Sequence, residues 1–241
     1  SSPNRDLWVF ETNAYGFTLS QLIDADEKYA LSGQLIITGP KWGADVISAM
    51  REWRNFRNDR VYSLMYENDN AGNWPENNVA TISSSTRRDP RWAGRDMLDV
   101  MLADMDGDGS LDAVEGSASG FVLLFRNVDG VGHTWDSALI DTFNGPDVIS
   151  VAAGRIDADQ FNDVVAGTDN GQVWWYKNDG SWVPLICDRV SGRRNCEVVS
   201  SEDSAPKLIA NYGAGVRVED LKLADMNKDG TNDLIASFSN N

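Results

Sequence analysis

The sequence predicts an all-β protein, a β-propeller of four-stranded antiparallel blades, with four blades of which one is split between the N- and C-termini. Gly, Asn, Asp and Ser are abundant and long amphipathic helical windows are scarce, which favours many short strands joined by turns. One order of strand patterns recurs along the chain, and repeated four-stranded units are typical of propellers. The two ends of the chain carry complementary halves of one further unit.

Size and charge limit the classes of function. A chain of 241 residues can bury a substantial core and form one domain, residues 1–241, especially if it is all-β. The net charge of −16 argues against nucleic acid as a partner, because phosphate binding needs a basic face. No apolar run is long enough to span a bilayer, so we expect no membrane insertion.

The most informative stretch is an acidic loop. Asp104, Asp106 and Asp108 alternate with small or apolar residues, Gly109 follows, and Asp112 closes the run. So many carboxylates in one short loop repel each other unless a cation lies among them. Calcium tolerates the irregular geometry of such a loop better than magnesium does. The loop therefore predicts a calcium site.

A second loop repeats this pattern from residue 225 to residue 233. Both copies together supply the candidate calcium ligands, which are Asp104, Asp106, Asp108, Ser110, Asp112, Asp225, Asn227, Asp229, Thr231 and Asp233. The first copy also fits a helix–loop–helix calcium site, with Glu115 at the twelfth position, but the second copy has Ala236 there. The flanking residues alternate without a helical period, which favours a loop between two strands.

Each unit contains four recognisable strands. The second strand starts at the closing Asp, the third is aromatic and leads to Asn, and the fourth starts near a Trp, with period-2 alternation and turn residues between strands. The second strands start at Asp45, Asp112, Asp163 and Asp233, the third strands at Val61, Phe121 and Val173, and the fourth strands near Trp74, Trp135 and Trp182. The blades cover about 33–83, 97–141 and 148–188, and the split blade combines 215–241 with 6–24.

The chain resembles the FG-GAP/VCBS repeat family of calcium-binding β-propellers. The resemblance lies in the two acidic loops, in residues 103–114 and 224–235, and in the trailing aromatic strand of residues 173–180, and it extends over most of the chain. It implies a propeller with calcium in its loops. Members of this family commonly have about seven blades, whereas this chain has material for four.

The third loop, from Arg155 to Asp163, departs from the pattern. Arg155 replaces the first carboxylate and Gln160 replaces the glycine. We expect this loop to be metal-free, with Arg155 paired to Asp157 and Asp159 in place of a metal. The corresponding stretch of the first unit keeps only Asp45 and is also expected to lack metal. Calcium is thus predicted at two sites.

Three arrangements of the split blade are open. The termini of one molecule can pair and close the ring, which removes two exposed sheet edges. Alternatively, they can pair between molecules and join subunits head to tail. The chain can also be a fragment of a longer propeller.

Arginine and tryptophan gather in insertions outside the repeat. The candidate ligand-binding residues are Arg51, Trp53, Arg54, Arg57, Arg91 and Trp92. Bidentate arginine suits carboxylate and sulfate groups, and tryptophan can stack on sugars. The competing interpretation is that these arginines pair locally with acidic neighbours in solvated loops. Cys187 and Cys196 are expected to form a local disulfide in an oxidising compartment, with two buried thiols as the alternative.

These features predict a secreted or cell-surface protein that is not an enzyme. It is expected to be a calcium-stabilised, lectin-like adhesion module that binds a glycan or an extracellular protein, itself included. One alternative is a structural subunit that assembles through the split blade. The other is a polysaccharide lyase or dehydratase, because some of these enzymes resemble the repeat family in their propellers.

Overall fold

The computed structural model shows an all-β protein, with no helix among the residues that it describes. It describes residues 7–13, 16–24, 28–37, 44–52, 60–66, 79–84, 96–180, 182, 186–190, 193–197 and 205–240, with side chains at 97–180, 182 and 205–240. In these ranges no helix is long and apolar enough to cross a membrane.

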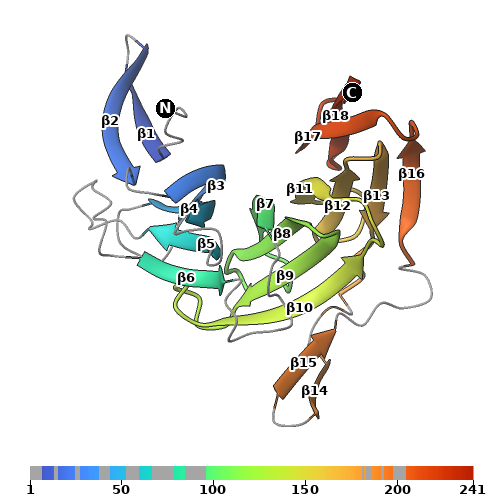
Figure 1. The fold of residues 1–241 in the computed structure, drawn as a ribbon, viewed down its shortest axis with the longest axis horizontal. Helices are drawn as coiled ribbons and strands as arrows, with labels where there is room; N and C mark the ends of the chain where they lie inside the picture. The colour runs from blue at the N-terminus through green and yellow to red at the C-terminus, as the bar shows by residue number, and fades with distance from the viewer. Residues whose placement is uncertain are drawn as a thin grey trace.

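In the described part of the chain, three sheets with four antiparallel strands each follow one another, and a hairpin adds two more strands to the second of them (Figure 1). The first contains β3 (Lys28–Ile37), β4 (Ala44–Glu52), β5 (Arg60–Tyr66) and β6 (Val79–Ser84) in that order. The second contains β7 (Asp96–Ala103), β8 (Asp112–Ala118), β9 (Phe121–Asn127) and β10 (Trp135–Thr142). The third contains β11 (Val148–Gly154), β12 (Asp163–Thr168), β13 (Gln172–Tyr176) and β16 (Lys207–Asn211).

Two further hairpins lie at the ends of the chain. β1 (Leu7–Asn13) pairs with β2 (Gly16–Asp24), and β17 (Val216–Ala224) pairs with β18 (Asp233–Asn240). Each is a separate two-stranded sheet in the described part of the chain, so the two halves of the expected split blade do not pair with each other here. Figure 1 shows the sheets arranged around an open arc, with these hairpins at its two ends.

The strand order within the units is largely as the repeat predicts. β8, β12 and β18 begin at the closing Asp, and the predicted aromatic third strands are β5, β9 and β13. The acidic loop after β7 leads directly into β8, so the helix–loop–helix alternative is wrong.

The prediction that the fourth strand of the third unit starts near Trp182 is wrong. β16, and not a strand near Trp182, pairs with β13, and Trp182 is instead buried in the core. The intervening chain forms a hairpin of β14 (Ile186–Val190) and β15 (Arg193–Glu197), which extends the second sheet at one parallel position, Leu139 opposite Glu197. The insertion displaced the fourth strand along the sequence without removing it from the sheet.

The second sheet packs on the third, and the third on the β17–β18 hairpin, through a glycine at the same place in the strand. A Cβ on Gly116 of β8 would lie 2.8 Å from Val148 of β11, and a Cβ on Gly167 of β12 would lie 2.4 Å from Val218 of β17. Both glycines stand four residues after the closing Asp, so the first strand of each following unit approaches the same place. The absence of a side chain at that position permits the close approach.

The cores lie between the sheets. Val114 and Leu124 of the second sheet pack with Val164 and Tyr176 of the third. Val165 and Val173, on the other face of the third sheet, pack with residues of the β17–β18 hairpin. Alternate residues of each strand therefore serve two different cores, as expected for strands buried on both faces.

Candidate metal loops

The first acidic loop, residues 104–112, connects β7 and β8 and is held by its own carboxylates. Asp104 accepts the backbone N–H groups of Gly107 through Oδ1, at 2.7 Å, and of Gly109 through Oδ2, at 3.0 Å. Gly107 and Gly109 have φ values of +77° and +89°, in the left-handed region that glycine adopts at little cost. These two glycines allow the backbone to curl around the Asp104 carboxylate.

Three carboxylates of this loop converge. One oxygen from each of Asp104, Asp106 and Asp108 lies within 4.8 Å of the others. Burial raises the pKa of Asp106, and the charges of Asp108 and Asp104 add to the rise, while the backbone N–H of Asp108 and Arg126 oppose it. The arrangement concentrates negative charge at one point, and oxygen donors are the ligands that calcium prefers. A divalent cation fits this donor set.

Asp112 closes the loop from inside the protein. Its two oxygens accept the backbone N–H groups of Met105, at 2.9 Å, and of Asn127, at 2.8 Å. Burial raises the pKa of Asp112 to about 7, and the charges of Asp106 and Asp108 contribute to the rise, although both hydrogen bonds lower it. Asp112 therefore ties the loop to β9 and adds a desolvated carboxyl group beside the cluster.

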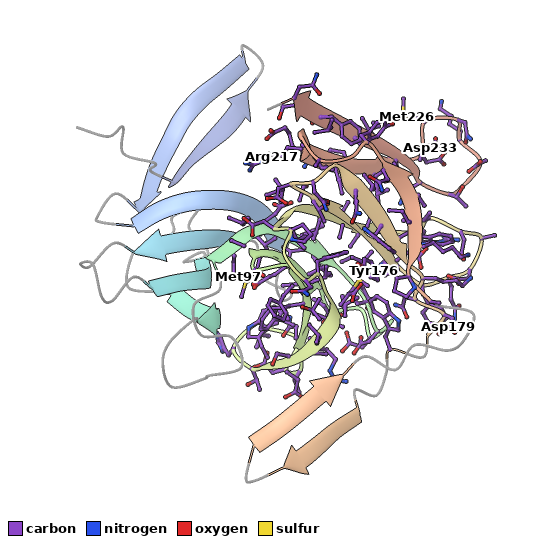
Figure 2. All side chains as sticks on the ribbon, turned by 45° about the vertical axis from the view of Figure 1, so that its right-hand side comes forward. Met97, Tyr176, Asp179, Arg217, Met226 and Asp233 are labelled. Atoms are coloured by element: carbon purple, nitrogen blue, oxygen red, sulfur yellow. The ribbon has the colours of Figure 1, made fainter. Side chains whose placement is uncertain are left out.

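The second acidic loop, residues 225–233, joins β17 and β18 and repeats this geometry. Asp225 accepts the N–H of Gly230 at 2.9 Å, as Asp104 accepts that of Gly109 in the first loop. Its other oxygen accepts the N–H of Asp229 at 3.1 Å, whereas that of Asp104 accepts the N–H of Gly107. Asp233 accepts the N–H of Met226 at 3.0 Å, as Asp112 accepts that of Met105. Figure 2 shows Met226 and Asp233 at the same end of the hairpin.

The second loop differs in its middle positions. Asn227 replaces a carboxylate and accepts the N–H of Asp229 at 2.9 Å through Oδ1. Thr231 donates to Asp229 from its N–H, at 2.8 Å, and from its hydroxyl, and the hydroxyl bond is the largest cause of the lowered pKa of Asp229. Lys228 takes a φ of +63° at the position of Gly107. An amide oxygen and a hydroxyl complete the set of donors here.

In the third loop, residues 155–163, a positively charged side chain lies among the carboxylates. The ammonium of Lys177 is hydrogen-bonded to Asp157 and lies 3.2 Å from the Asp159 carboxylate. The predicted role of Arg155 is wrong in detail: its Nε donates to the backbone carbonyl of Asp159, at 3.1 Å. A lysine from the end of the third strand, and not the arginine in the loop, neutralises these carboxylates.

Arg126 occupies the equivalent position in the second sheet. Arg126 and Lys177 each precede the Asn that follows the aromatic strand. Arg126 lies farther from its loop, with 3.6 Å from Nη1 to Asp106 and 3.6 Å from Nη2 to Asp136. It divides its charge between two carboxylates, which leaves the first loop less neutralised than the third.

The three loops lie side by side along one end of the sheets. The side-chain amide of Asn162 donates to the carbonyl of Asp104 at 2.8 Å. In the next pair of units, the N–H of Asn232 donates to the carbonyl of Arg155 at 2.7 Å. The loop of residues 155–163 is thus fastened to the loop of residues 104–112, and the loop of residues 225–233 is fastened to that of residues 155–163.

The predicted ligand-binding surface lies almost entirely outside the described residues. Arg51 lies in β4, and its side chain is outside them; Trp53, Arg54, Arg57, Arg91 and Trp92 fall outside them completely. The register of β14 and β15 pairs Cys187 directly with Cys196. Residues paired in this way are about 4.5–5.5 Å apart at Cα, within the range of a disulfide, which stays a prediction.

A scan against protein-family models and a search of curated proteins found no match to this chain. The resemblance to the FG-GAP/VCBS repeats therefore stays a prediction from the motifs. Sequence reasoning missed Lys177 and Arg126 as the residues that meet the loop carboxylates. The signal that could have identified them is the basic residue before Asn127 and Asn178, at equal distances from the closing Asp.

Proposed function

We propose that this chain is a calcium-stabilised β-propeller that acts outside the cell as a non-enzymatic binding module for carbohydrate or protein. The observation that carries the proposal is the convergence of Asp104, Asp106 and Asp108 within 4.8 Å. The hydrogen bonds that the first and last carboxylates of this loop accept from Gly109 and Met105 have counterparts in the loop of residues 225–233. Successive four-stranded sheets, each packed on the next around an arc, support the propeller arrangement (Figure 1).

Calcium in this proposal is structural. Each loop joins the first two strands of a unit, and its closing carboxylate is fastened to the backbone at the start of the loop. A cation that neutralises the clustered carboxylates lowers the free energy of the folded state only, so its binding energy adds to stability. The occupied loops would hold a rigid face from which the insertions project, and surface loops are where binding residues concentrate.

Melting curves in calcium and in chelator test this role. Calcium at a hundred times its dissociation constant should stabilise each site by about 2.7 kcal/mol, and Asp229→Ala should reduce the calcium-dependent shift by removing one site. Glu219→Ala is the matched control, because Glu219 is an exposed carboxylate of β17 outside both loops. A melting temperature that is equal in calcium and in chelator would refute the structural role.

A glycan array and a pull-down with extracellular proteins, each run in calcium and in chelator, test the binding function. The proposal expects calcium-dependent capture of at least one glycan or protein. It also expects this capture to weaken in a chain with Arg54 and Arg57 changed to Gln. Release of unsaturated sugars from an acidic polysaccharide would instead support the lyase alternative.

A further inference from the structure

The β17–β18 hairpin has the features of an incomplete sheet, because one edge of β18 is unpaired among the described residues. In each of the three complete sheets the second strand pairs with a third, but β18 pairs only with β17 in the described part of the chain. Ile235 corresponds to Val114 and Val165, which are 0% and 1% exposed, whereas Ile235 is 46% exposed. An unpaired edge beside an exposed apolar side chain is suited to the addition of a strand from another chain.

β1 matches the missing third strand. β1 and β9 are both seven-residue strands, and each ends at an Asn. The register is constant in the complete sheets: the residue after the closing Asp pairs with the residue two before this Asn. The pairs are Val46 with Tyr66, Ala113 with Phe125 and Val164 with Tyr176. The same rule pairs Leu234 with Glu11 and Ala236 with Val9.

The carboxylate of Asp233, which closes the acidic loop, gives a second reason to place β1 beside β18. Asp112 and Asp163 each accept, at 2.8 Å, the backbone N–H of an Asn at the end of the third strand or just after it, Asn127 and Asn178. Asp233 accepts the N–H of Met226, but the described residues around it supply no third-strand Asn. Asn13 holds this position in β1, so the rule that places β1 beside β18 also brings the missing donor to Asp233.

We infer that the β1–β2 hairpin of a second copy of this chain completes the β17–β18 sheet, and that two copies close one ring. The inference rests on the proposed propeller arrangement but not on calcium. Within one chain the two hairpins lie at opposite ends of the open arc (Figure 1). Two copies, each with the three complete sheets found among the described residues, and two shared sheets make about eight blades, the upper end of the usual propeller range, and three copies would exceed it.

Reciprocal exchange makes the two contacts equivalent. Each copy gives its N-terminal hairpin to the C-terminal hairpin of its partner, so a two-fold axis relates the junctions and no free edge remains at β18. The first sheet of the partner then follows its own β1–β2 hairpin, as β11 follows β10 in the chain. It would cover the face on which Ile235 is exposed.

Light scattering on the full chain tests the number of copies. The expected mass is twice the 26.5 kDa of one chain, and a mass of 26.5 kDa at micromolar concentration would overturn the inference. The measurement is repeated in chelator. A dimer that shows no calcium-dependent melting would remove the proposed calcium role and leave the exchange intact, so the two proposals fail separately.

Cysteine cross-linking tests the register and the partner. Val9→Cys and Ala236→Cys chains, purified separately, mixed and oxidised, should give a cross-linked heterodimer, since paired positions lie within disulfide range. Phe10→Cys is the matched control, because adjacent strand residues point to opposite faces, and it should cross-link at least tenfold less.

The doubly substituted chain separates the remaining outcomes. Val9→Cys with Ala236→Cys in one chain should give a covalent dimer on a non-reducing gel. A fast-migrating monomer would show that the hairpins pair within one chain, and a dimer without cross-links would show a different interface; either result would overturn the inference.

Discussion

Replacing Lys177 by Gln tests whether a lysine takes the place of a metal in the third loop. The ammonium contacts Asp157 and Asp159, and all three side chains are about a quarter exposed, at 24–29%. Exposed ion pairs contribute about 0.2–1 kcal/mol, and hydrogen bonds to charged groups about 1.5–3 kcal/mol. Two contacts between side chains that are about a quarter exposed place the expected loss of unfolding free energy at about 1–2 kcal/mol.

Urea unfolding at pH 7 in low salt measures this loss. Lys222→Gln is the matched control, because Lys222 pairs with Asp220 at 2.8 Å but both side chains are more than half exposed. The control should cost less than about 0.5 kcal/mol, and added salt should narrow the difference between the two variants. Equal stability of the Lys177 and Lys222 variants would refute the reasoning.

A double variant extends the same reasoning. Arg155→Asp combined with Lys177→Gln restores the first carboxylate of the acidic loop and removes the ammonium that lies among the others. We expect this chain to bind one more calcium ion than the wild type, measured by calorimetry. An unchanged number of bound ions would show that the lysine is not what keeps calcium out.

Three further predictions concern packing, pH and the cysteines. Gly167→Ala places a Cβ 2.4 Å from a side-chain carbon of β17 and should cost about 1–3 kcal/mol in urea unfolding, whereas Ser237→Ala at the equivalent exposed position of β18 should cost little. Burial raises the pKa of Asp163 to about 6, so the wild type should lose about 2–3 kcal/mol relative to Asp163→Asn between pH 4 and pH 8; parallel unfolding curves would contradict this. The Cys187–Cys196 disulfide should appear as a loss of two hydrogens in the intact mass, and its reduction should cost about 2–3 kcal/mol.

The direction in which pH changes the stability follows from the raised pKa of Asp163. Asp163 is fully buried, one of its oxygens accepts no hydrogen bond, and the nearby charge of Asp157 opposes its ionisation. The folded protein therefore binds this proton more tightly than the unfolded chain does. Its stabilising contribution is complete below the pKa of about 3.8 of the unfolded chain and is lost as pH rises through about 6.

The repeat could be predicted because local chemistry marks it. The closing Asp, the small or apolar residues after it and the aromatic third strand lie close together in sequence, and their alternation fixes the strand and its register. Gly116 and Gly167 also recur at a constant distance from the closing Asp, which their packing against the next unit explains. These features are repeated because each unit packs against a following unit of the same kind.

Other features could not be predicted because they depend on distant partners. Lys177 reaches the third loop from the end of β13, and no local pattern in the loop itself indicates this. The fourth strand of the third unit lies beyond an inserted hairpin. The repeat distance therefore predicts a strand near Trp182, whereas the strand starts at Lys207. The pairing of strands decides which side chains contact the loops, and the sequence of a loop does not indicate how the strands pair.

The number of calcium ions bound per chain tests the account most directly. Isothermal titration of calcium-free protein should find two sites, one at Asp104–Asp112 and one at Asp225–Asp233. Asp106→Ala and Asp229→Ala should each leave one site, and the melting temperature should rise with occupancy. Absence of calcium binding in the wild type, or binding that neither substitution changes, would contradict the assignment of these two loops as the calcium sites.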